Sequence, residues 1–189
     1  GKYYCVMASG NHEKKTANLL LYKSEDLFNW EYKGILCEWE NSKFAECPSF
    51  MESGDKYLLT ASVCTESDHR FSVMYGKFED CRFTPEYTGE VDKGPDQYAG
   101  QVFLDHKGRT ILISWLPGWQ YAGYKKKDIG CMSVPREIKL TDGKITAFPV
   151  KEVQHLLKDS DPALKRTETG FIIERQGREP VIYEGEILD

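Results

Sequence analysis

A repeat of about 53 residues is the sequence feature that most limits what this chain can fold into. Three segments, residues 1–9, 55–62 and 108–115, share a short polar turn followed by an apolar, strand-like run. A second element, Tyr22–Leu27, recurs at the same spacing as Tyr75–Asp80. Self-similarity at roughly 40–55 residues, with several short strands in each period, is typical of the blades of a β-propeller.

The repeat predicts an all-β protein that contains part of a β-propeller. Each period holds about four short strands separated by turns, which is the content of one blade. About three blades are represented, whereas a closed propeller needs at least four or so. A plain β-sandwich with similar hairpins is the alternative. The segment from Lys151 to Lys158 is the one place where one or two helical turns are expected.

The composition changes after Pro149-Val150, which divides the chain. We expect residues 1–150 to belong to the propeller and residues 151–166, which are polar, to form a linker. Strand-like sequence resumes at 170–174 and 180–187, so residues 167–189 begin a second β domain. Both ends of the chain lie inside strand-like sequence, and we therefore expect it to be part of a larger protein.

Charge and cysteine content exclude several classes of function. The net charge is −5 and Lys125–Lys127 is the only basic run of three, so nucleic acid is not an expected partner. No apolar run approaches the ~18 residues of a membrane span. The six cysteines form no C-x-x-C pair, so a zinc site is not expected, and the sequence predicts no other metal or cofactor. Their apolar surroundings favour reduced thiols and a cytoplasmic rather than a secreted location. The oligomeric state stays open.

Glu46 is the candidate catalytic residue. The innermost strand of each blade should precede the turn of its repeat; Glu46 lies nine residues before Asp55, and Ala99 lies nine before Gly108. Both positions are therefore expected at the mouth of the central channel, while the matching position of the first repeat precedes Gly1. A carboxyl group beside apolar residues is a candidate general acid, because a low dielectric favours its protonated form. A surface glutamate is the alternative.

Five stretches resemble, in order and spacing, the motifs of glycoside hydrolase family 32, the β-fructosidases. The likeness covers roughly residues 1–157, and Glu46-Cys47-Pro48 resembles the Glu-Cys-Pro motif of that family. The other four stretches are Tyr22–Trp30, Asp92–Ala99, Arg109–Trp115 and Ser133–Leu140.

The resemblance implies a five-bladed propeller followed by a C-terminal β-sandwich, which residues 167–189 would begin. It also implies a retaining mechanism, in which an aspartate attacks the anomeric carbon and Glu46 serves as acid and then base. The nucleophile belongs to an N-terminal motif that these 189 residues do not contain. The chain by itself is therefore expected to be inactive. Sucrose, sucrose 6-phosphate and fructans such as inulin or levan are the substrates implied.

The resemblance also places Asp96, Tyr98 and Trp115 near the substrate. Cys47 and Pro48 would shape the strand around Glu46, and Asp92 is expected to cap its own loop. Two departures from the family pattern affect substrate contacts: Ser49 replaces an aspartate, and Gln97 replaces an aromatic residue.

Two other functions remain open from the sequence. One is a sugar-binding module without catalysis, which needs no pair of carboxylates. The other is a related five-bladed glycosidase acting on arabinan or xylan, against which the Glu-Cys-Pro context argues.

Overall fold

The computed structural model describes residues 2–92, 94, 96–118, 130–153, 164–166, 170–175 and 178–184, and these confirm the all-β prediction. Lys151–Val153 form one helical turn at the place where helix was expected, and residues 154–158 lie outside the described part. The chain divides into two compact units, Gly1–Pro149 and Val150–Asp189. The strands are β1 (Tyr3–Asn11), β2 (Thr16–Ser24), β3 (Glu31–Glu40), β4 (Phe44–Ser53), β5 (Lys56–Cys64), β6 (His69–Glu79), β7 (Arg82–Gly89), β8 (Tyr98–Leu104), β9 (Thr110–Leu116), β10 (Cys131–Met132), β11 (Arg136–Thr141), β12 (Lys144–Pro149), β13 (Leu164–Arg166), β14 (Gly170–Arg175) and β15 (Arg178–Glu184).

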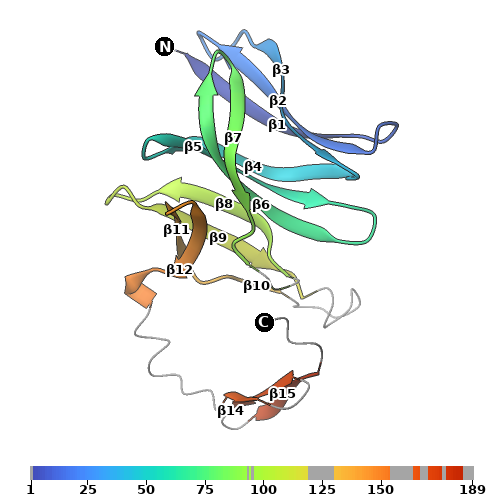
Figure 1. Ribbon diagram of the computed structural model, residues 1–189, viewed down its shortest axis with the longest axis vertical. Helices are drawn as coiled ribbons and strands as arrows, with labels where there is room; N and C mark the ends of the chain where they lie inside the picture. The colour runs from blue at the N-terminus through green and yellow to red at the C-terminus, as the bar shows by residue number, and fades with distance from the viewer. Residues whose placement is uncertain are drawn as a thin grey trace. The chain divides into compact units, whose positions relative to one another are not determined.

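The first unit contains three antiparallel sheets that follow the sequence repeat (Figure 1). The first sheet has the order β1-β2-β3, and the second has the order β4-β5-β6-β7. In the third sheet β8, β9, β11 and β12 are neighbours in turn, and β10 adds to the end of β9. Strands β1, β5 and β9 are the three repeated apolar segments, and β4 and β8 are the strands that precede two of them. The sheets are therefore blade-like units, while the number of blades in a closed ring stays a prediction.

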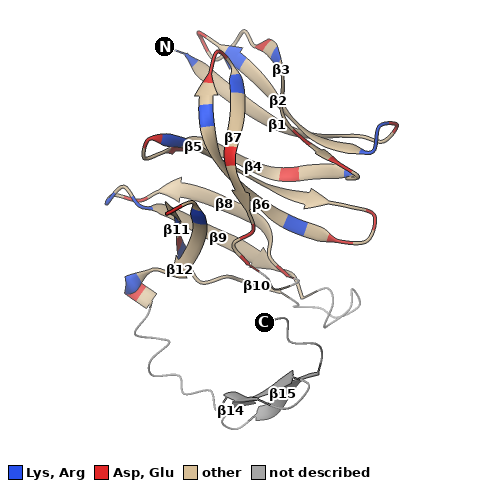
Figure 2. Cartoon of the chain, in the orientation of Figure 1, with Lys and Arg blue, Asp and Glu red and all other residues tan. Residues whose placement is uncertain are grey.

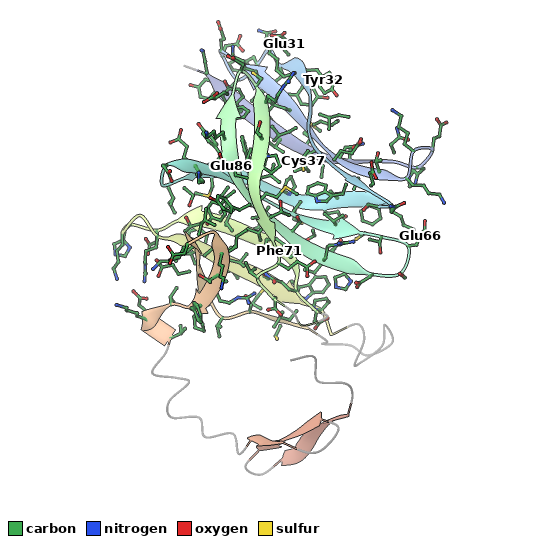
Figure 3. The ribbon with its side chains drawn as sticks, viewed as in Figure 1. Glu31, Tyr32, Cys37, Glu66, Phe71 and Glu86 are labelled. Atoms are coloured by element: carbon green, nitrogen blue, oxygen red, sulfur yellow. The ribbon has the colours of Figure 1, made fainter. Side chains whose placement is uncertain are left out.

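Strand β5 is buried on both faces because it lies between two packed layers. Leu59, Ala61 and Val63 point to one side and join a first core cluster with residues of β2, such as Leu19. Leu58 points to the other side and joins a second cluster with residues of β6, β9 and β11. Side chains of successive strand residues point to opposite faces, so a strand buried on both faces is apolar or small throughout. Figure 3 shows Cys37, which packs against the first cluster, and Phe71, a member of the second, among these interior side chains.

Besides the helical turn at Lys151–Val153, the described part of the second unit is a three-stranded antiparallel sheet of β13, β14 and β15. The strand expected at 170–174 is confirmed as β14. The strand expected at 180–187 is described up to Glu184 as β15. The linker at 151–166 and the assignment of residues 167–189 to a β-sandwich stay predictions.

Candidate active site

A β-bulge on β4 sets the direction of the Glu46 side chain. Glu46 pairs with Ser62 of β5, but the next pair is Ser49 with Thr60, so β4 holds one extra residue here. Cys47 lies in this bulge and has a φ of 50°, in the left-handed region that residues other than glycine rarely adopt. Its carbonyl oxygen accepts a hydrogen bond of 3.1 Å from Nε2 of Gln101 on β8. The expectation that Cys47 shapes this strand agrees with its place in the bulge.

The same irregularity occurs at the matching place in the next repeat. Tyr98 of β8 pairs with Trp115 of β9, and the next pair is Gln101 with Ile113, which again leaves one residue extra. Ala99 has a φ of 49°, and its backbone N–H donates a hydrogen bond of 2.9 Å to Oγ of Ser62. Glu46 and Tyr98 therefore hold equivalent positions, each directly before a bulge.

These two equivalent side chains meet between the second and third sheets. The phenol O–H of Tyr98 donates a hydrogen bond to Oε2 of Glu46, and the phenol oxygen lies 3.2 Å from Sγ of Cys64. The ring of His69 packs edge-on against the ring of Tyr98, with the centroids 5.1 Å apart. Tyr98 is buried, and burial together with its bonds to Cys64 and Glu46 raises its pKa far above the ordinary value. Tyr98 therefore stays protonated and acts as a donor at any physiological pH.

The carboxyl group of Glu46 is exposed in this chain, so the expectation that it lies buried beside apolar residues is wrong here. The bulge turns the side chain toward Tyr98 at the edge of the sheet, and the two core clusters do not cover it. Burial and the nearby charge of Glu46 raise the pKa of the Cys47 thiol. The same two causes raise the pKa of Cys64, and both cysteines are free thiols.

The structure places the remaining candidate residues around β8 and β9. Oδ2 of Asp96 accepts a hydrogen bond of 2.7 Å from the backbone N–H of Gly118, while its Oδ1 is buried without a hydrogen-bond partner among the described residues. Trp115 is half-buried and lies opposite Tyr98 in the register of β8 and β9. The geometry thus brings Glu46 to Tyr98 and Tyr98 beside Trp115, and it ties Asp96 to Gly118.

The two positions that depart from the family pattern both have partners within the protein. Oγ of Ser49 lies 3.5 Å from Oε1 of Gln101 and accepts a bond of 3.4 Å from the Val102 N–H, so it links β4 to β8. Gln97 is buried and donates a hydrogen bond of 2.9 Å from Nε2 to Oγ of Ser114 on β9. Their effect on substrate contacts stays a prediction.

Sequence reasoning gave no role to Arg136, which lies in the Ser133–Leu140 motif. Its Nη1 donates a hydrogen bond of 2.8 Å to Oδ2 of Asp92, in the Asp92–Ala99 motif. Oδ1 of Asp92 accepts from the backbone N–H of Gly94, so the expected capping role is confirmed. The pair Asp92 and Arg136 therefore joins two of the motifs. The opposite charges are visible in the sequence, but their proximity depends on the pairing of β9 with β11.

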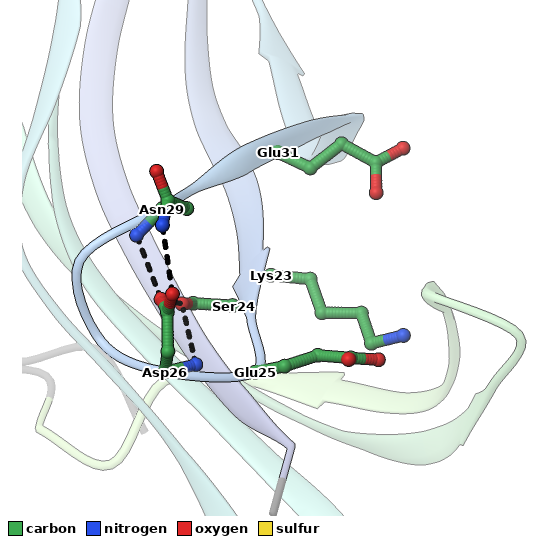
Figure 4. Close-up of a pocket in the computed structure, with 6 residues that line it drawn as sticks. All are labelled: Lys23, Ser24, Glu25, Asp26, Asn29 and Glu31. Carbon is green, nitrogen blue, oxygen red and sulfur yellow. Dashed lines mark hydrogen bonds between the residues drawn. The ribbon is translucent and has the colours of Figure 1, made fainter.

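The Tyr22–Trp30 motif builds a turn and the pocket shown in Figure 4. Oγ of Ser24 accepts bonds from the N–H groups of Asp26 and Leu27, and the Asp26 carboxylate accepts from those of Phe28 and Asn29. The side-chain amide of Asn29 also donates to Asp26. These bonds hold the pKa of Asp26 well below its usual range. The motif therefore accounts for a turn between β2 and β3, on a different sheet from Glu46.

Figure 2 shows lysines and arginines interspersed with aspartates and glutamates over the sheets of the first unit. Within the described residues, no group of three or more His, Cys, Asp or Glu side chains is arranged to hold a metal ion. Among the residues that the structure describes, no helix is long and apolar enough to cross a membrane.

The blade-like antiparallel sheets place this chain in the class of propeller-like proteins. The carboxyl group at the strand bulge is its candidate acid–base site. The protein-family model described as "Glycosyl hydrolases family 32 N-terminal domain" matches residues 1–149. The chain therefore belongs to glycoside hydrolase family 32.

Individual relatives agree with this family. A sucrose-6-phosphate hydrolase of Zymomonas mobilis is 31% identical over 181 residues, which cover 84% of this chain and 35% of that protein. A sucrose-6-phosphate hydrolase of Staphylococcus xylosus is 29% identical over 178 residues, 87% of this chain and 36% of that protein. The solved structure of a β-fructofuranosidase from Bombyx mori gives a TM-score of 0.69 at 28% identity, covering 89% of this chain and 37% of that one. The chain spans about a third of the length of these proteins.

Proposed function

We propose that this chain is the part of a retaining β-fructosidase that carries the acid–base carboxyl group, Glu46. The observation that carries the proposal is the hydrogen bond from Tyr98 to Glu46, made between equivalent bulges of two neighbouring repeats. A catalytic carboxyl group must be held in one orientation, and a buried, permanently protonated phenol is a donor that does so. The strained backbone at Cys47 and Ala99 supports the same reading, because such strain concentrates at functional sites.

In the proposed reaction, an aspartate nucleophile attacks the anomeric carbon of a fructosyl unit while Glu46 protonates the oxygen of the leaving group. The ionised Glu46 then removes a proton from the water that hydrolyses the fructosyl-enzyme intermediate. Asp96, Tyr98 and Trp115 are proposed to line the substrate site. The nucleophile would lie in the part of the family's length that these residues do not cover, so we propose that the chain alone is inactive.

The proposed substrates carry a β-linked fructosyl unit: sucrose, sucrose 6-phosphate or a fructan. The relatives named sucrose-6-phosphate hydrolase and β-fructofuranosidase support this class.

Replacing Glu46 in the longer protein that contains this chain tests the proposal. Glu46→Gln keeps the shape but removes the proton donor, and we expect kcat on sucrose to fall about 10²–10⁴-fold. An aryl fructoside with an acidic leaving group needs little protonation, so its first step should lose much less. Glu52→Gln is the matched control: Glu52 lies on the same strand, is exposed and bonds only Tyr57 among the described residues. Equal losses on both substrates, or a loss below about tenfold, would contradict the assignment of the acid.

The 189-residue chain itself separates the alternatives. Incubation with sucrose, inulin or arabinan should release no sugar, since one carboxylate of the pair is absent. Calorimetric binding of fructose or inulin by this chain would instead support a sugar-binding module that needs no nucleophile. Hydrolysis of arabinan by the longer protein, with none of sucrose, sucrose 6-phosphate or inulin, would overturn the proposed substrate class.

A further inference from the structure

A thiol contacts the same phenol group of Tyr98 that bonds Glu46. Cys64 is the last residue of β5, and its Sγ lies 3.2 Å from the phenol oxygen of Tyr98. Cys64 pairs with Phe44 and Glu46 pairs with Ser62, so the two side chains lie near the same end of the β4–β5 ladder. Tyr98, on β8 of the next sheet, reaches both of them.

The protons available on Cys64, Tyr98 and Glu46 determine the direction of the hydrogen bonds between these three side chains. A phenol has one proton, and Tyr98 donates it to Oε2 of Glu46. Toward Cys64 the phenol oxygen therefore accepts, and the thiol S–H is the donor. Burial raises the pKa of both Cys64 and Tyr98, which keeps both groups protonated in the working pH range. The result is a chain of two bonds that runs from Cys64 through Tyr98 to the carboxylate.

We propose that Cys64 is a positioning residue for the acid–base group: its S–H bond to Tyr98 strengthens the bond that Tyr98 donates to Glu46. Hydrogen bonds in such a chain polarise one another, so the thiol favours the ionised carboxylate and fixes its orientation. This inference rests on the proposed function of Glu46, but the coupling between the three groups can be measured without catalysis.

The charged and titratable groups around Cys64 come from several elements. Glu46 lies on β4, and the positive charge of Lys43, just before β4, favours the thiolate. The Lys43 ammonium is 2.9 Å from a carboxylate oxygen of Glu66. His69 is the residue opposite Cys64 on β6. The variants below keep Lys43, Glu66 and His69 in place, so none of these groups can account for the changes expected.

Thiol reactivity in the 189-residue chain tests the coupling directly. Iodoacetamide is the probe, and the alkylation of Cys64 is followed from pH 7 to 10 by peptide mass spectrometry. Glu46→Gln removes a negative charge and frees the Tyr98 proton for the thiolate, so Cys64 should react about three- to tenfold faster at pH 8. Adding Tyr98→Phe to Glu46→Gln removes that donor and should slow the reaction again. Cys131 is exposed and should react alike in every variant, which controls for the reagent. An unchanged or slower rate at Cys64 in Glu46→Gln would overturn the proposal.

The pH profile of the longer enzyme tests the consequence for catalysis. Cys64→Val removes the donor, and the alkaline limb of kcat/KM should move up by about half a pH unit. Cys64→Ser restores a donor and should return the limb toward its original position, whereas a purely structural role would leave the limb in place. Cys5→Ala, on β1 of another sheet, is the control. An unmoved limb in Cys64→Val overturns the proposal. If the longer protein has no fructosidase activity, the proposed function fails, while the alkylation result still decides the coupling.

Discussion

Arg136 carries a positive charge to a position where its side chain is only 12% exposed. One of its nitrogens bonds Asp92, and Nε and Nη2 are buried without hydrogen-bond partners among the described residues. A charge held in this way depends strongly on its counter-ion, because desolvation penalises it and one carboxylate provides the compensation. Two residues from separate motifs therefore stabilise each other, and neither contacts Glu46 in the described structure.

Removing the counter-ion should be costly. Asp92→Ala leaves the Arg136 guanidinium without its carboxylate and uncaps the Gly94 N–H, so we expect a loss of about 3 kcal/mol in the free energy of unfolding. Asp92→Asn keeps an oxygen for Gly94 and should lose less. Urea denaturation of the 189-residue chain measures both, with Asp55→Ala in an exposed turn as the control. A loss for Asp92→Ala no larger than that of the control would show that the pair contributes nothing.

The sequence repeat came within one residue of the equivalent of Glu46: the spacing aligns Glu46 with Ala99, whereas the bulges make Tyr98 its structural equivalent. It could not predict that the two side chains touch. That contact depends on a bulge in each strand and on the packing of one sheet against the next. The bulges have a left-handed φ at Cys47 and Ala99, and neither residue is the glycine that would signal such a φ in the sequence. Cys64 was missed as a partner for the same reason.

At the scale of elements, β5 is the strand on which the first unit is assembled. Its apolar residues are divided between the two core clusters, so the strand packs against the first sheet on one face and the third sheet on the other. Its hydroxyl residues Thr60 and Ser62 are also fully buried, and Ser62 accepts the bond from the bulge of β8. The central strand therefore contributes both to packing and to the position of Tyr98.

Substitutions on the two faces of β5 should be equally harmful. Leu59→Ala opens a cavity in the first cluster and Leu58→Ala opens one in the second, and each should lower the free energy of unfolding by about 3 kcal/mol. Hydrogen exchange should distinguish them: protection falls on β2 for Leu59→Ala and on β9 for Leu58→Ala. Val134→Ala, at a residue that is 44% exposed, is the control. A loss below about 1 kcal/mol at either leucine would contradict the two-sided burial.

The strands could be predicted well because alternation and turns are local properties. The three repeated segments at 1–9, 55–62 and 108–115 overlap strands β1, β5 and β9 with ends that differ by at most two residues. The short strand β10 was not expected, since Cys131-Met132 has no alternating pattern and pairs with β9 only through long-range contacts.

At the scale of the whole molecule, the chain consists of two compact units of very different size, Gly1–Pro149 and Val150–Asp189. Both core clusters belong to the first unit. The family model also matches residues 1–149. The active-site candidates therefore all lie in the first unit, and its stability determines whether they are held in place.

We expect the first unit to fold without most of the second. A chain of residues 1–153, which keeps the buried Val150, should unfold cooperatively in urea with a midpoint within about 0.5 M of the full chain. Circular dichroism and the near-ultraviolet signal of its buried aromatic residues would follow the transition. A broad transition without a folded baseline would show that residues 154–189 are required for the core.

The bulge at Cys47 makes this segment tolerant of one kind of mutation and intolerant of another. Ala45 and Phe50 both pack toward the first cluster although they are five residues apart, because the bulge reverses the alternation of β4 between them. Exchanging Cys47 for another small residue keeps that reversal, whereas deleting it would turn either Glu46 or Phe50 to the opposite face. Through evolution, this strand can thus vary in residue type at the bulge, while insertions and deletions of single residues between Ala45 and Phe50 should be eliminated.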